Sequence, residues 1–162
     1  CLDANNAPDF QHAPKPKHTP NQTMSERVQP QTLRLFVSAT NDLEAERAIV
    51  GKALADLPVQ IRAEIRRTPA TGAKNDDVYE LISNVDKVYF LLGRDISAPS
   101  GAEWHMAMQL ERTVVPLYNG ARLSPAAQQF KQNSLHVWQE FRGVSDLARI
   151  ITLDLILSLI HI

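Results

Sequence analysis

Two charged residues, Arg47 and Glu103, fall at positions where a helix is expected to face the core. Arg47 interrupts an apolar stripe at helical spacing, four residues after Leu43 and three before Val50. Glu103 lies three residues before Met106, on a face that further apolar residues continue. Each helix follows an apolar strand, so both charges are expected near the same end of a sheet. A carboxylate and a guanidinium turned partly inward at one place predict a functional site.

Strand and helix patterns alternate from Leu33 onward with short connections. Strands are expected at 33–38, 59–66, 87–92, 113–118 and 135–141, and helices at 42–57, 75–84, 100–111, 124–132 and from 144 onward. Pro116 weakens the fourth strand unless it lies at a strand end. Such alternation requires right-handed crossovers and a parallel sheet covered on both faces. We predict an α/β fold, a doubly wound sandwich with a five-stranded parallel sheet in the order 2-1-3-4-5.

In this order the chain reverses direction across the sheet between strands one and three, and ligands bind there, outside the carboxyl ends of the strands. The loops at this switch point are 38–41 and 93–101. The topology and the misplaced charges therefore predict the same crevice. The candidate substrate-binding residues in and around it are Ser38, Thr40, Asn41, Arg47, Gly93, Asp95, Ser100 and Trp104.

Several of these candidates have a structural interpretation that the sequence leaves open. Ser100-x-x-Glu103 has the spacing of a capping box, in which the glutamate turns back onto the serine amide. Asn41 followed by Glu44 has a similar pattern at the first helix, with Asn41 as N-cap. Arg47 is suited to a structural clamp on Glu103 or on a backbone carbonyl. A large aromatic residue such as Trp104 more often packs in the core than stacks on a ligand.

Composition and charge argue against several classes of function. The 162 residues suffice for one domain and a tail. With 17 basic and 18 acidic residues, the chain has no excess positive charge that would favour binding to nucleic acid or to an anionic membrane. The single cysteine, Cys1, excludes an internal disulfide framework, and the histidines have no ligand spacing, so no metal site is expected. No secretion signal opens the chain and no run approaches the roughly 20 apolar residues of a membrane span. We expect a cytoplasmic protein.

Composition changes sharply near residue 31. Residues 1–31 contain five of the ten prolines and little aliphatic content, which is typical of a disordered leader. Residues 32–162 are expected to form the α/β domain. At its end, residues 150–162 place apolar side chains on every side of a helix, more than one sheet face requires. This excess predicts either a domain cut where another begins or a surface that binds a partner.

Three segments resemble a known family: FVSATNDLEAER at 36–47, VYFLLG at 88–93 and SGAEWHMA at 100–107. Together they are similar to a TIR-like family of unknown function that precedes NACHT-type signalling NTPases, over roughly residues 33–141. TIR domains and nucleoside 2-deoxyribosyltransferases are broader relatives of this flavodoxin-like fold. The chain departs from the family at Ala39, where the usual Ser-Ser-Thr becomes Ser38-Ala39-Thr40 and one hydroxyl is lost.

The resemblance implies cleavage of an N-glycosidic bond, in NAD or in a nucleoside. Both broader relatives use a glutamate at the start of the third helix on a ribosyl carbon, and by position that residue is Glu103. Its carboxylate would stabilise or attack a carbon with oxocarbenium character. Nicotinamide leaves NAD without a proton, whereas a nucleobase needs an acid, for which Asp95, Asp76 and Asp77 are the candidates.

The same resemblance gives the loop residues binding roles. Ser38 and Thr40 would donate to a ribose or a phosphate, and Trp104 would stack on a base. Asp42 and Glu44, in the first turn of the first helix, oppose an anion there. NAD is therefore expected as a substrate and not as a bound cofactor.

Two functions of different class follow. One is a nucleotide-directed enzyme, an NAD glycohydrolase or nucleoside deoxyribosyltransferase type. The other is a non-catalytic signalling module that assembles with copies of itself or with a fused NTPase domain. The inward Glu103 favours the enzyme, whereas Ala39 and the absence of an obvious second acid favour the module.

Overall fold

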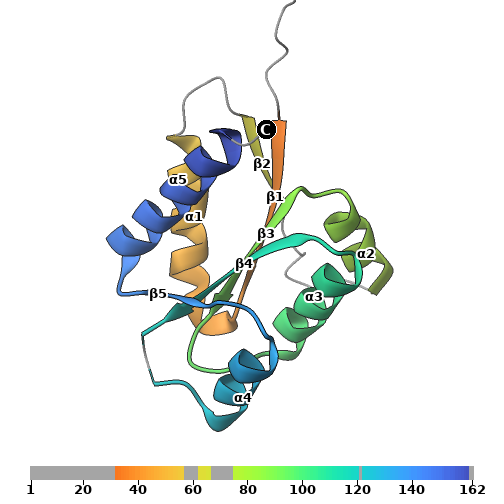
Figure 1. Ribbon diagram of the computed structural model, residues 1–162, viewed down its shortest axis with the longest axis vertical. Helices are drawn as coiled ribbons and strands as arrows, with labels where there is room; N and C mark the ends of the chain where they lie inside the picture. Colours follow the sequence, from red (N-terminus) through yellow and green to blue (C-terminus); the bar gives the residue numbers. More distant parts are fainter. Residues whose placement is uncertain (1–31, 57–61, 67–74, 121, 161–162) are drawn as a thin grey trace, which may run out of the picture.

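The computed structural model describes residues 32–56, 62–66, 75–120 and 122–160 (Figure 1). The predicted leader at 1–31, residues 59–61 of the second predicted strand and the final residues 161–162 lie outside the described part of the chain. Strands and helices alternate along the described residues, which confirms the prediction of an α/β fold.

The strands form one parallel sheet. Their bounds are β1 Thr32–Ala39, β2 Arg62–Arg66, β3 Lys87–Leu92, β4 Thr113–Asn119 and β5 Gln139–Phe141. They lie in the order β2-β1-β3-β4-β5, and every neighbouring pair is parallel, which is consistent with a flavodoxin-like fold. All six residues of β3 are buried, as a strand covered on both faces requires.

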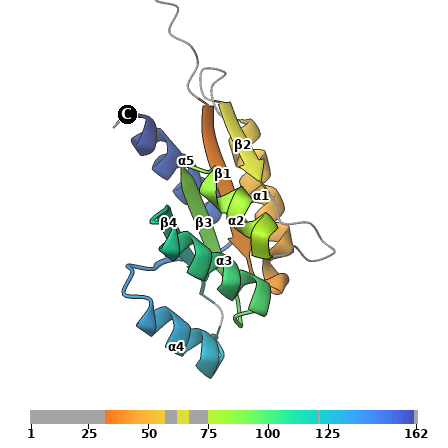
Figure 2. The same ribbon diagram turned by 90° about the vertical axis from the view of Figure 1, so that its right-hand side faces the viewer.

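Helices cover both faces of the sheet (Figures 1 and 2). Their bounds are α1 Glu44–Ala55, α2 Asn75–Ser83, α3 Ala98–Gln109, α4 Pro125–Asn133 and α5 Val144–Ile160. α1 and α5 pack side by side on one face, over a core that includes Val37, Tyr89 and Leu155. α2, α3 and α4 cover the other face, over Phe36 and Phe90.

Two helix starts differ by two residues from the predicted boundaries. α3 begins at Ala98, two residues before the predicted start, because Ser97 is its N-cap and Pro99 fits the first turn. α1 is preceded by a short 3-10 helix, η1 Asn41–Leu43, whose N-cap is Thr40. The prediction of Asn41 as N-cap is therefore wrong, because the chain enters the helical turn one residue earlier.

Two strand predictions also need adjustment. β5 covers only 139–141 of the predicted 135–141. Leu135, at the predicted start, adopts a left-handed backbone with φ +56°, which is not compatible with a strand. Pro116 lies inside β4 and not at its end. β5 pairs only with Leu117–Asn119, so at Pro116 β4 has a strand partner on one side alone, where proline is tolerated.

Candidate functional site

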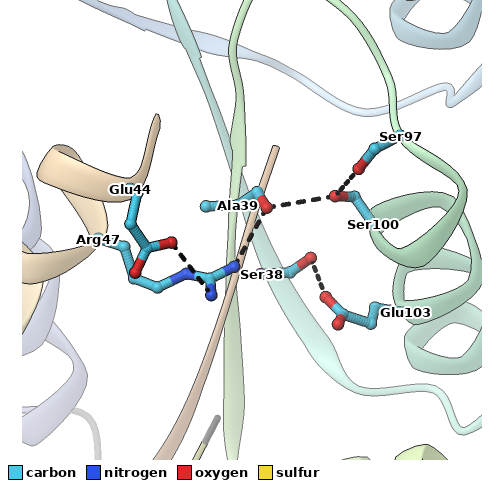
Figure 3. A network of polar contacts seen from close by, with 7 residues as sticks. All are labelled: Ser38, Ala39, Glu44, Arg47, Ser97, Ser100 and Glu103. Atoms are coloured by element: carbon cyan, nitrogen blue, oxygen red, sulfur yellow. Dashed lines mark hydrogen bonds and ion pairs between the residues drawn. The ribbon is translucent and has the colours of Figure 1, made fainter. Parts of the chain in front are cut away.

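The carboxyl end of β1 sends consecutive side chains to opposite faces of the sheet. Ala39 belongs to the core beneath α1 and α5. Ser38 therefore points toward α3, where its hydroxyl donates a hydrogen bond to the carboxylate of Glu103 (Figure 3). Ser38 is fully buried and Glu103 is 4% exposed. A polar pair thus occupies the sheet–helix interface at the switch point, where apolar side chains would suffice for packing.

Ser100 reaches the same strand from one turn earlier in α3. Its hydroxyl lies 3.3 Å from the carbonyl oxygen of Ala39, to which it donates, and 2.8 Å from the hydroxyl of Ser97. The capping-box interpretation of Ser100 and Glu103 is therefore wrong. Because α3 starts at Ala98, both residues lie within the helix, three apart on the side that faces β1.

Arg47 approaches the end of β1 from the other side. Its guanidinium donates to the carbonyl of Ala39 at 3.1 Å and pairs with the exposed carboxylate of Glu44 at 3.5 Å. Figure 3 places Arg47 on the α1 side of β1 and Glu103 on the α3 side. The expectation that both face one crevice is not met, because they flank the strand. The contacts of Arg47 are those of a structural clamp on a backbone carbonyl.

Thr40 and Asp42 join the two loops at the switch point. The Thr40 hydroxyl accepts from the amide of Gly93 at 2.9 Å and donates to Oδ1 of Asp42 at 2.7 Å. Oδ2 of Asp42 accepts from the amide of Arg94 at 2.7 Å. The Thr40 amide also donates to the carbonyl of Leu91 at 3.1 Å, so the segment after β1 is tied to the segment after β3.

Asp42 is the residue here that sequence analysis did not place in the site. The sequence predicts only that the Asp42 charge, in the first turn of the first helix, opposes the binding of an anion there. The available signal was its spacing, two residues after Thr40 at a helix start, where aspartate often binds local backbone or side-chain groups. The sequence does not indicate the partner of the Asp42 carboxylate, because Arg94 lies 52 residues away.

The remaining candidates lie at helix starts and in the loop between β3 and α3. Asn41 is exposed at the start of η1. Asp95 accepts hydrogen bonds from its neighbour Ile96 and from the Ser124 hydroxyl at the N-cap of α4, so it orders the loop between β3 and α3. Asp76 and Asp77 are exposed in the first turn of α2.

Trp104 belongs to an aromatic cluster between the sheet and α4. Its ring stacks on Trp138 with centroids 5.4 Å apart and meets the edge of Phe90 at 4.9 Å. Phe130 and His136 pack against the same ring. Because Trp104 is buried among these rings, its contacts are those of core packing. The sequence does not predict the cluster, since its members come from three separate elements and from the loop before β5.

The described residues contain no group of three or more His, Cys, Asp or Glu that could hold a metal ion. No helix in the described ranges has both the length and the apolar character needed to cross a membrane. In comparisons with known proteins, no family model matches the chain and no curated protein matches it.

Proposed function

We propose that this chain is a TIR-like, nucleotide-directed module that cleaves the N-glycosidic bond of NAD or a nucleoside, with Glu103 as the carboxylate that acts on the ribosyl carbon. One observation carries the proposal: a buried carboxylate, bonded to Ser38, lies at the carboxyl end of β1 beside the switch point of a parallel sheet. Open α/β sheets bind their ligands at that place.

The chemistry needs one carboxylate at the anomeric carbon. As the bond from C1′ to the base nitrogen breaks, its electron pair leaves with the base and C1′ becomes electron-deficient. An ionised Glu103 would stabilise that charge or form a bond to C1′, which water then replaces with a hydroxyl. With NAD the products are nicotinamide, ADP-ribose and one proton, and no acid is required because the departing nitrogen was positively charged.

The conformation described here covers the proposed catalytic group. Glu103 is buried against Ser38, and the Thr40 contacts hold the loop after β3 against the loop after β1. A ligand would therefore reach Glu103 only after the 93–97 loop or the first turn of α3 moves away from β1. Substrate-induced movement of such loops is common in enzymes that exclude water from the reaction.

The covered carboxylate also supports a second function, a non-catalytic signalling module that associates with itself or with a fused NTPase domain. In that case the Ser38–Glu103 pair only fixes α3 on the sheet. A further observation favours this function. Leu153, Ile156 and Leu157 are exposed along α5, which leaves an apolar stripe of the kind that protein partners cover.

Nicotinamide release from NAD by the complete 162-residue chain tests the two functions. We expect turnover by the wild type and a loss of at least about 100-fold in Glu103→Gln, which keeps the size of the side chain but removes its charge. Glu80→Gln, an equivalent change at an exposed position of α2, serves as the matched control and should keep full activity. Circular dichroism should show that both variants fold.

The same assay, repeated with a panel of nucleosides, separates the outcomes. Release of nicotinamide or base that survives in Glu103→Gln would contradict the role of Glu103. No release from NAD or from any nucleoside, together with light scattering that shows association of the chain, would instead support the assembly module.

A further inference from the structure

We propose that Asp42 is a specificity-determining residue that excludes phosphate from the switch point, so that the site takes an uncharged nucleoside in preference to a nucleotide or dinucleotide. This inference rests on the proposed function and ranks its two substrate classes: a nucleoside is the better substrate, and NAD, which carries a pyrophosphate, is the poorer one. It starts from the groups that hold the Asp42 carboxylate.

The donors around Asp42 are those that α/β proteins commonly offer to a phosphate. One oxygen accepts from the Thr40 hydroxyl at 2.7 Å and the other from the backbone amide of Arg94 at 2.7 Å. Hydroxyls and amides from the loops at the carboxyl ends of the strands bind anions in many such folds. In this chain an anion supplied by the protein already occupies them.

The space at Gly93 supplies a second observation. A Cβ atom built on Gly93 would overlap both carboxylate oxygens of Asp42. Because glycine has no side chain, another group can come close to its backbone, as a phosphate does at the glycines of nucleotide-binding loops. The Asp42 carboxylate fills this space, so a phosphate could bind the Arg94 amide only by displacing Asp42.

The charges nearby strengthen the exclusion. Glu44 and Glu46 lie in the first turn of α1 and cancel the attraction of the helix N-terminus for an anion. Arg47 is engaged by the Ala39 carbonyl and the Glu44 carboxylate on the α1 side of β1. At the neighbouring α4 terminus, Asp95 accepts from the Ser124 hydroxyl. Four carboxylates, of Asp42, Glu44, Glu46 and Asp95, thus lie around the ends of β1 and β3, against the two cationic side chains of Arg47 and Arg94. A ligand without phosphate avoids the repulsion of this excess negative charge.

Paired ligands that differ only in a phosphate give a direct test. Calorimetry should compare the four common ribonucleosides with their 5′-monophosphates on the 162-residue chain, its Asp42→Asn variant and Asp56→Asn. We expect the wild type to prefer the nucleoside by about tenfold or more, from like-charge repulsion across a few ångströms. Asp42→Asn should reduce that preference about tenfold, whereas Asp56→Asn changes an exposed carboxylate just after α1 and should leave it unchanged.

A second measurement does not depend on catalysis or on the identity of the base. Inorganic phosphate should shift the backbone amide resonances of Gly93 and Arg94 in Asp42→Asn and not in the wild type. If it does so while no nucleoside binds or turns over, the anion-excluding role stands and the proposed function fails. Equal phosphate responses in the two proteins, no response in Asp42→Asn, or a wild type that binds monophosphates as tightly as nucleosides would overturn the inference, whatever Glu103 does.

Discussion

At the scale of single residues, the Ser38 hydroxyl has the clearest energetic role. It is fully buried and donates to the carboxylate of Glu103, which is itself buried. Replacing a buried donor leaves its acceptor less well satisfied and costs about 1–3 kcal/mol. We therefore expect Ser38→Ala to lower the free energy of unfolding by that amount in urea titrations followed by circular dichroism.

A serine on the surface provides the control for this prediction. Ser145 is exposed near the start of α5, and Ser145→Ala should change the unfolding free energy by less than about 0.5 kcal/mol. Combining Ser38→Ala with Glu103→Gln should cost less than the sum of the single changes, because the two side chains share one interaction. Strict additivity would mean that the pair is not energetically coupled.

At the scale of elements, a polar contact fixes α5 on the sheet near the start of β3. The Asp154 carboxylate accepts from the Lys87 ammonium at 2.9 Å and from the Tyr89 hydroxyl at 2.6 Å. Burial, and then the hydrogen bond to Asp154, raise the pKa of Tyr89 far above its usual range, so the hydroxyl remains a donor. We expect Asp154→Ala to destabilise the protein by about 2–4 kcal/mol in urea titrations, because it leaves the buried ammonium of Lys87 without its counter-charge.

Lys87→Met in the Asp154→Ala background separates charge burial from lost packing. Methionine keeps most of the apolar stem of lysine without its charge, so the double variant should recover part of the lost unfolding free energy. If the double variant is less stable than Asp154→Ala alone, the uncompensated charge of Lys87 is not the cause of the destabilisation.

At the scale of the whole molecule, the two faces of the sheet are expected to unfold together. Both tryptophans lie on the face covered by α3 and α4, whereas Leu155 is fully buried on the face covered by α5. Leu155→Ala should cost about 2–5 kcal/mol and lower the urea midpoint of tryptophan fluorescence and of circular dichroism equally, because the faces share one sheet.

Leu157→Ala is the matched control, since Leu157 is 55% exposed on the same helix. Its effect on both midpoints should be small. A Leu155→Ala protein that loses helical signal while its tryptophan fluorescence keeps the wild-type midpoint would show that the faces unfold independently.

The alternation of elements could be predicted from the chain alone, because periodicity and the short connections between apolar segments are local properties. The buried run of β3 and the inward positions of Leu43 and Val50 are examples. Element ends were less predictable. Leu135, the first residue of the predicted fifth strand, is kept out of β5 by a left-handed backbone that no local pattern at a leucine indicates.

The candidate site divides in the same way. The sequence by itself determined that Glu103 faces inward beside the end of β1, because helical spacing sets the direction of a side chain. Only the tertiary structure decided its partner: Ser38 faces α3, while Arg47 reaches the Ala39 carbonyl from the α1 side of the strand. It also decided that Asp42 bonds to Arg94. Such pairings depend on which strands become neighbours and on which helix covers each face of β1, and neither is encoded in residues close together in the chain.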